Sequence, residues 1–167
     1  MIYRVDAYVG LGSNLDAPIA QVRRALDELG KLPLTESIGA SRLYVTRPVG
    51  PQDQPDFINA VAHLSTHLSP LALLDQLQAL EQRHRRRRIR HWGPRTLDLD
   101  LLVYGNETLQ LPRLNVPHPQ MKVRGFVLLP LAELAPRLRL PDGSHVGALA
   151  KALGTTDGVE VLPDNLG

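Results

Sequence analysis

Hydrophobic and polar residues alternate near the start of the chain. Val5, Ala7, Val9 and Leu11 are each separated by one residue, so their side chains would share one face of a strand. The glycine- and asparagine-containing stretch Gly12–Asn14 follows them and favours a turn. The first element predicted from the sequence is therefore a strand that ends in this turn.

A helical pattern follows the turn. Asp16 is placed to cap the helix, Pro18 lies in its first turn, and Gly30 is positioned as a C-terminal cap. The apolar stripe at helical spacing consists of Ile19, Val22, Leu26 and Leu29.

Two further hydrophobic stretches, Ser37–Thr46 and Phe57–Leu68, predict strands. Between them, RPVGPQDQPD contains three prolines and one glycine, and a loop of this length favours a functional role. A second helix is predicted from Ser69–Pro70 to about Arg83. Its apolar face contains Leu73, Leu77 and Leu80.

The segment Leu97–Tyr104 predicts another strand, and its period of two places Asp98 and Asp100 on one face with leucines on the other. The element order is then βαββαβ, which indicates an α+β fold with a ferredoxin-like core: an antiparallel sheet with helices packed on it. In a C-terminal extension we expect a loop around His118, a short helical turn at Pro130–Leu134, and a helix capped by Ser144. We expect residues 1–167 to form a single domain.

Positive charge is concentrated in one segment. The chain has 19 Lys and Arg against 17 Asp and Glu, but Arg83–Arg95 alone contributes seven arginines, so the remainder has 12 against 17, a balance of −5. Proteins that bind nucleic acid or membrane surfaces usually spread their basic residues over several elements. The focused charge instead predicts a compact polyanionic ligand, with no nucleic acid and no membrane as partner.

Other compositional features point to a cytoplasmic protein. The chain has no cysteine, which fits a reducing compartment. Arg4 and Asp6 interrupt the N-terminal stretch where a signal peptide would be apolar. We expect a monomer that acts on small molecules.

Asp98 and Asp100 are candidate metal ligands. Two carboxylates at i and i+2 of a strand point the same way and can share a hard cation such as magnesium. A bare Asp-x-Asp is more often a solvated face, and a run of arginines is more often a solvated tail that binds nucleic acid. Here the arginines lie mid-chain, between a predicted helix and a predicted strand, and guanidinium groups beside carboxylates are typical of magnesium–nucleotide chemistry.

Several long stretches resemble the 6-hydroxymethyl-7,8-dihydropterin pyrophosphokinases of folate biosynthesis. They are GPQDQPDFIN, RHWGPRTLDLDLLVYGNE, VPHPQMKVRGFVLLPLAELAP and LPDG, and the resemblance extends from Gly10 to Gly143. It implies that the chain transfers the terminal two phosphates of ATP, as one unit, to the hydroxymethyl group of a reduced pterin and releases AMP.

The resemblance also implies roles for individual residues. Two magnesium ions would be held by Asp98 and Asp100, and Arg85 and Arg95 would close on the phosphates. The nucleotide would be bound by Glu81, Arg87, Trp92, His118 and Arg124. The pterin would be bound by Thr46, Arg47, Val49, Phe57, Asn59 and Phe126.

The chain departs from the family pattern before its tryptophan, where His91 replaces an arginine and Arg90 lies one place earlier. Either residue could make the corresponding phosphate contact. The segment after Glu81 is also one residue short, which leaves the positions of Glu81, Arg85 and Arg87 open by one.

Two other functions fit parts of the pattern. A ferredoxin-like sheet can stack RNA bases on aromatic side chains, although only 4% of this chain is aromatic. A magnesium-dependent phosphohydrolase could use the same two aspartates with water as the acceptor.

Overall fold

The structure is a computed structural model that describes residues 3–15, 17–47, 55–86, 97–154 and 158–163. Its first strand, β1 (Val5–Ser13), continues through Gly12 and Ser13, where the sequence predicted a turn. It does so because Gly12 pairs with strands on both sides and Ser13 pairs with one, and this pairing outweighs their local preference for a turn.

Helix α1 (Pro18–Leu29) has the predicted extent, with Pro18 in its first turn. The predicted cap Asp16 lies outside the described residues. At the N-cap position is Ala17, whose φ of 59° is in the left-handed region and whose side chain makes no capping hydrogen bond. Gly30 ends the helix as predicted, and its N–H bonds the carbonyl of Glu28.

The predicted strand Ser37–Thr46 is divided into β2 (Thr35–Ala40) and β3 (Tyr44–Thr46). Both pair with β4 (Phe57–Thr66). Between them, the Ser41 hydroxyl accepts a hydrogen bond from the Val61 N–H at 2.9 Å. The Ser41 side chain thus accepts the hydrogen bond that a backbone carbonyl would accept in a regular sheet, and the strand is interrupted at this point.

Helix α2 (Pro70–Arg86) continues one turn past the predicted end. The Ser69 hydroxyl accepts a hydrogen bond from the Ala72 N–H at 3.2 Å, as an N-cap does. The predicted strand after the arginine segment is β5 (Asp98–Tyr104).

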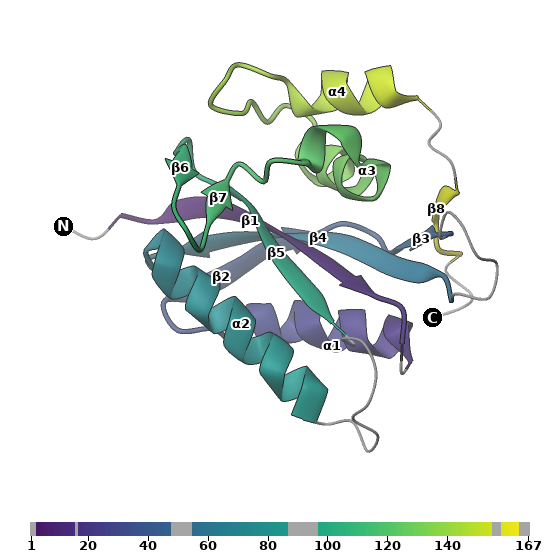
Figure 1. Ribbon diagram of the computed structural model, residues 1–167, viewed down its shortest axis with the longest axis horizontal. Coiled ribbons are helices and arrows are strands. Elements are labelled where there is room, and N and C mark those ends of the chain that lie inside the picture. The colour runs from purple at the N-terminus through teal and green to yellow at the C-terminus, as the bar shows by residue number, and fades with distance from the viewer. Residues whose placement is uncertain (1–2, 16, 48–54, 87–96, 155–157, 164–167) are drawn as a thin grey trace.

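The main sheet has the order β5-β1-β4-β3-β8, with β2 also paired to β4, and every pairing is antiparallel. The elements β1, α1, β2, β4, α2 and β5 give the predicted ferredoxin-like α+β core, as Figure 1 shows. The short strand β8 (Val159–Val161) extends the sheet beside β3 and was not predicted.

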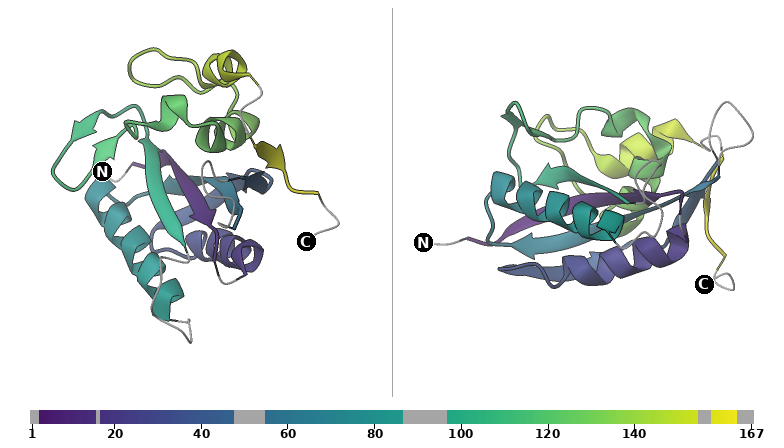
Figure 2. Two further views of the ribbon diagram at one scale, coloured as in Figure 1. Left: turned by 45° about the vertical axis from the view of Figure 1, so that its right-hand side comes forward. Right: turned by 60° about the horizontal axis from the view of Figure 1, so that its bottom comes forward.

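Helices cover both faces of the sheet: α1 and α2 lie on one face, and α3 (Gly125–Leu134) and α4 (Val146–Leu153) on the other (Figures 1 and 2). The first face carries the larger core, which includes the leucines predicted for α2. The second core is smaller and contains Tyr8, Val61 and Leu102 from the sheet. The two cores use alternate residues of the same strands.

The pairing of β5 with β1 contains a bulge. Tyr8 pairs with Val103 but Val9 pairs with Leu101, so Leu102 is an extra residue in β5. Leu102 and Val103 both belong to the smaller core, whereas Leu101 and Tyr104 belong to the larger one. The alternation of side chains between the two faces of the sheet is therefore interrupted at Leu102 in β5.

The C-terminal region differs most from the prediction. It begins with a two-stranded sheet and a single helical turn, neither of them predicted: β6 (Leu109–Gln110), β7 (Asn115–Val116) and the 3-10 turn Met121–Val123. Helix α3 (Gly125–Leu134) is twice as long as the predicted Pro130–Leu134 and includes Pro130 internally. The burial of its apolar residues offsets the hydrogen bond that the proline cannot donate.

Helix α4 (Val146–Leu153) forms as predicted, but its cap is His145 and not Ser144. The His145 Nδ1 accepts a hydrogen bond from the Ala148 N–H at 3.1 Å. Within the part of the chain that is described, no helix is both long and apolar enough to cross a membrane.

Candidate active site

Three strands bring predicted site residues into one row across the sheet. Gly12 of β1 pairs with Asp98 of β5 on one side and with Asn59 of β4 on the other. Adjacent strands are about 4.8 Å apart, so Asp98 and Asn59 are separated by about 10 Å along this row. Asp100 is opposite Gly10, one step along the same face.

All of these residues point to the face that carries α3 and α4. Tyr8, Val61 and Leu102 belong to the smaller core on that face. Residues two apart in a strand lie on the same face. Gly10 and Gly12 therefore share the face of Tyr8 in β1. In the same way, Asp98 and Asp100 share the face of Leu102 in β5, and Asn59 shares the face of Val61 in β4. Asp98 is half-buried and Asp100 is exposed. The predicted shared face of the two aspartates is confirmed.

The Asn59 side chain is buried and oriented by Thr46. The Thr46 hydroxyl donates a hydrogen bond to Asn59 Oδ1 at 2.7 Å. A Cβ atom at Gly12 would lie 3.1 Å from Asn59 Nδ2, which is a tight contact. Gly12 therefore leaves room for this amide. Because Gly12 has no side chain, the sheet surface between Asn59 and Asp98, which we call the floor of the site, carries no side chain at this position.

Phe57 and Phe126 come from different layers of the fold. Phe57 pairs with Thr46, is half-buried, and shares the face of Asn59 because it lies two residues before it. Phe126, in the first turn of α3, is partly buried against the smaller core. The Arg124 guanidinium carbon lies 5.6 Å from the Phe126 ring centroid, within cation–π range.

His118 is held beside β5. Its backbone N–H donates a hydrogen bond to the carbonyl oxygen of Leu102 at 2.8 Å. Its ring Nδ1 accepts a hydrogen bond from the backbone N–H of Gln120 at 3.2 Å. Burial lowers the pKa of His118 and nearby Arg124 lowers it further, while Asp100 acts in the opposite direction. The neutral ring therefore carries its proton on Nε2, which is available to donate.

Glu81 and Arg85 lie at the end of α2. Glu81 is half-buried, and its Oε2 accepts a hydrogen bond from the Leu99 N–H at 2.7 Å. Leu99 is the residue between the two aspartates. Arg85 is exposed one turn further along the helix.

The remaining predicted residues have these positions. Arg47 is exposed at the end of β3, where its N–H bonds the carbonyl of Gly158 at 3.1 Å. Several predicted residues lie outside the described residues: Val49, Arg87, Trp92 and Arg95, together with Arg90 and His91.

Asp98 and Asp100 supply two carboxylates to the candidate metal site. Among the described residues, no three His, Cys, Asp or Glu side chains are grouped so that they could hold a metal ion. Two carboxylates suit magnesium, which commonly takes one or two of them and completes its shell with water and substrate phosphate oxygens.

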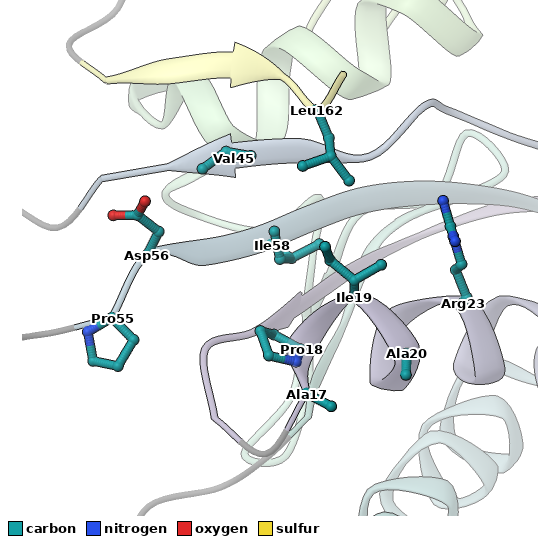
Figure 3. Close-up of a pocket in the computed structure, with 10 residues that line it drawn as sticks. All are labelled: Ala17, Pro18, Ile19, Ala20, Arg23, Val45, Pro55, Asp56, Ile58 and Leu162. Carbon is teal, nitrogen blue, oxygen red and sulfur yellow. The ribbon is translucent and has the colours of Figure 1, made fainter. Parts of the chain in front are cut away.

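A separate hollow of about 870 Å³ lies on the opposite face of the sheet. Figure 3 shows Ile19 of α1 and Ile58 of β4, two of its lining residues, pointing toward each other. Ile58 belongs to the larger core, and its neighbours Phe57 and Asn59 point to the other face. This apolar hollow is therefore distinct from the row of Asp98, Gly12 and Asn59.

Sequence reasoning missed the contribution of Gly10 and Gly12, because the segment was interpreted as the end of a strand and a turn. A signal was present: the two glycines have the same spacing of two as Asp98 and Asp100. Side-chain-free positions at strand spacing indicate a close approach of another group to the sheet.

The chain is similar to known proteins along most of its length. The family model of 7,8-dihydro-6-hydroxymethylpterin-pyrophosphokinase (HPPK) matches residues 8–136. A 2-amino-4-hydroxy-6-hydroxymethyldihydropteridine pyrophosphokinase from Pseudomonas aeruginosa is 55% identical over 163 residues, which cover 98% of this chain and 99% of that protein. One from Haemophilus influenzae is 46% identical over 159 residues, covering 95% of this chain and 99% of the relative.

Solved structures share the fold. A crystal structure of Plasmodium falciparum HPPK-DHPS superimposes with a TM-score of 0.75 at 14% sequence identity and covers 96% of this chain. This chain spans 49% of that longer protein.

Proposed function

Because the chain belongs to the 7,8-dihydro-6-hydroxymethylpterin-pyrophosphokinase family, we propose that the row of Asp98, Gly12 and Asn59 is its active site. The enzyme transfers pyrophosphate from ATP to 6-hydroxymethyl-7,8-dihydropterin in the synthesis of tetrahydrofolate. The proposal is supported chiefly by the way this row places a carboxylate pair and an amide at opposite ends of a side-chain-free floor.

The reaction needs two substrates in one orientation. The hydroxymethyl oxygen of the pterin forms a bond to the β-phosphorus of ATP, and the bond from that phosphorus to the oxygen bridging it to the α-phosphorus breaks. The electron pair leaves with AMP, and the hydroxymethyl proton passes to solvent or to a nearby base. Holding the acceptor oxygen in line with the scissile bond accounts for much of the rate in such a transfer.

The phosphate half of the site would be formed by Asp98 and Asp100. Their oxygen donors on one face suit magnesium, and we propose that they hold two such ions. Bound magnesium neutralises charge on the triphosphate. Arg85 and Arg95 would supply further positive charge to the phosphates as the transfer proceeds.

The nucleotide would also be bound by Arg87 and Trp92 and by two residues beside β5. His118 would donate its Nε2 proton, because Nδ1 is already engaged by the Gln120 N–H. Arg124 lies close enough to influence the pKa of His118 and would add a cation near the same group.

The pterin half of the site would be formed around Asn59. A pterin presents hydrogen-bond donors and acceptors along one edge, and an amide matches both. The Thr46 hydroxyl fixes Asn59 Oδ1 at 2.7 Å, so the amide is oriented before the substrate arrives. Phe57 and Phe126 would contact the flat faces of the ring, and Arg47 and Val49 would also contact the pterin.

We also propose that the protein works as a monomer in the cytosol on these two small molecules, with neither nucleic acid nor membrane as partner. The absence of cysteine is consistent with a reducing compartment. Size-exclusion chromatography with light scattering would test the monomer, and fractionation of cells would test the location.

The reaction is tested by mixing purified protein with ATP, magnesium and the reduced hydroxymethylpterin. AMP and the pterin pyrophosphate should form in equal amounts, and omission of magnesium should stop the reaction. ADP or free phosphate as the main product would rule out pyrophosphate transfer. AMP that forms without pterin would indicate hydrolysis instead.

A further inference from the structure

The carboxylate of Glu81 touches the backbone of β5 between the two aspartates. Its Oε2 accepts a hydrogen bond from the Leu99 N–H at 2.7 Å. Strand β5 is the terminal strand on its side of the main sheet. Its outward N–H groups therefore have no neighbouring strand in that sheet, and a side chain from α2 supplies an acceptor.

Strand geometry explains what this bond fixes. Successive N–H groups of a strand point to opposite edges, so an outward N–H at Leu99 places those of Asp98 and Asp100 toward β1. Asp98 pairs there with Gly12, and Asp100 with Gly10. Pairing with β1 holds this stretch of β5 from one edge, and the Glu81 carboxylate holds it from the other.

Packing holds both ends of the hydrogen bond in place. Leu80, next to Glu81, has no exposed surface, and Leu99 is 5% exposed. Both leucines belong to the larger core. The distance of 2.7 Å between the Leu99 nitrogen and Glu81 Oε2 is within the normal range of an N–H···O hydrogen bond.

Glu81 is not arranged as a third metal ligand. Within the described ranges, no three acidic or histidine side chains form a group suited to a metal ion. One oxygen of the carboxylate is bonded to the backbone of the strand that carries both aspartates. This contact points to a role exerted through β5.

We propose that Glu81 is a positioning residue that fixes the Leu99 peptide and thereby the relative orientation of the Asp98 and Asp100 carboxylates. The inference rests on the proposed function of the two aspartates as metal ligands. In this role Glu81 acts as a hydrogen-bond acceptor. An uncharged side chain of the same shape that also accepts a hydrogen bond can therefore replace it, whereas a side chain without an acceptor cannot.

The test compares Glu81→Gln with Glu81→Ala, and Gln82→Ala is the control because Gln82 is the exposed neighbour on the same helix. Hydrogen exchange of the Leu99 amide is measured by NMR in the full-length protein. The dissociation constant for Mn²⁺ is measured by electron paramagnetic resonance with a non-hydrolysable ATP analogue bound.

In Glu81→Ala, the Leu99 amide should exchange at least about tenfold faster and Mn²⁺ should bind about tenfold more weakly, as expected for the loss of one hydrogen bond to a charged group. Glu81→Gln should remain within about threefold of the wild type in both measurements, because its amide oxygen can accept the same bond. The Gln82→Ala control should match the wild type.

Two results would overturn the inference: unchanged Leu99 exchange in Glu81→Ala, or Mn²⁺ binding as weak in Glu81→Gln as in Glu81→Ala. The second result would show that the negative charge is what matters. Asp98→Ala and Asp100→Ala separate this inference from the proposed function. If both variants bind Mn²⁺ normally, the two aspartates are not the metal ligands. The exchange rate of the Leu99 amide still tests whether Glu81 holds the Leu99 peptide.

Discussion

The Tyr44 hydroxyl donates a hydrogen bond of 2.5 Å to the Glu133 carboxylate, which joins β3 to α3 across one face of the sheet. The other carboxylate oxygen accepts the Arg42 N–H at 2.9 Å. Burial raises the pKa of Tyr44 to about 12, and the bond to Glu133 adds to that rise. The contact connects α3, which carries Phe126 in its first turn, to β3, which ends with Thr46.

Removing this hydroxyl should destabilise the protein. Tyr44→Phe keeps the ring but removes the donor to a half-buried carboxylate, and we expect the free energy of unfolding to fall by about 1–2 kcal/mol. Urea denaturation measures it. Tyr3→Phe is the control, because Tyr3 is 70% exposed. An equal effect of the two changes would contradict a specific role for the contact.

The stability contributed by Glu133 should depend on pH. Burial raises the pKa of its carboxyl, but the hydrogen bonds from Tyr44 and Arg42 outweigh burial and leave the pKa below its ordinary value of about 4.5. The folded state then binds fewer protons than the unfolded state in this range. The contribution is complete above about pH 4.5 and is lost as the pH falls through the lowered pKa.

Glu133→Gln removes this titration. Its free energy of unfolding should therefore depend less on pH between about 3 and 5 than that of the wild type. Denaturation curves at a series of pH values measure the difference. Glu107→Gln, which replaces an exposed glutamate between β5 and β6, is the control substitution. Parallel curves for Glu133→Gln and the wild type would show that the group does not titrate as described.

Replacing either aspartate should stop catalysis without unfolding the protein. Asp98→Ala and Asp100→Ala should each lower kcat by at least about a thousandfold, since a loss of about 4 kcal/mol of charge stabilisation corresponds to that factor. Thermal unfolding should change little, because Asp100 is exposed and Asp98 is half-buried. Asp75→Ala, an exposed aspartate of α2, is the control. Near-normal activity at saturating magnesium would remove that aspartate from the metal site.

The floor at Gly12 should be sensitive to a single methyl group. In Gly12→Ala the new Cβ would lie 3.1 Å from Asn59 Nδ2, so the amide must move. We expect the KM for the pterin to rise about tenfold, which corresponds to about 1.4 kcal/mol of lost binding, with a smaller change for ATP.

Gly39→Ala is the matched control for this prediction. It is the same substitution within a strand, but its Cβ would make an ordinary contact of 3.5 Å with Leu134. Initial rates over a range of pterin concentrations distinguish the two variants. If Gly12→Ala raises the KM for ATP more than that for the pterin, the floor belongs to the nucleotide half of the site.

Local periodicity was sufficient to predict the elements that have one buried face. Helix α1, helix α2 and strand β5 lie where apolar residues recur at helical or strand spacing. The shared face of Asp98 and Asp100 follows from the same rule. These features depend on neighbours in the sequence, which is why the sequence revealed them.

Features that depend on distant contacts were not predictable in this way. The division of β2 from β3 depends on Ser41, whose hydroxyl binds the backbone of Val61 twenty residues away. Strand β8 forms only because β3 offers an edge. Helix α3 includes Pro130 because the second core buries its apolar side chains. The bond from Glu81 to Leu99 likewise joins a helix and a strand with no local pattern to indicate it.

The extra residue in β5 decides the side of the sheet on which the chemistry takes place. Counted back from Tyr104 in strict alternation, Asp100 and Asp98 would point into the apolar layer under α1 and α2. The bulge at Leu102 reverses that parity, and both carboxylates point to the face that carries Asn59. Without the bulge, a chain of the same length would turn both aspartates into the core, whereas deletion of Leu102 would remove the extra residue and leave them on the face of Asn59. The bulge between Asp100 and Tyr104 therefore sets the side of the sheet to which the two aspartates point.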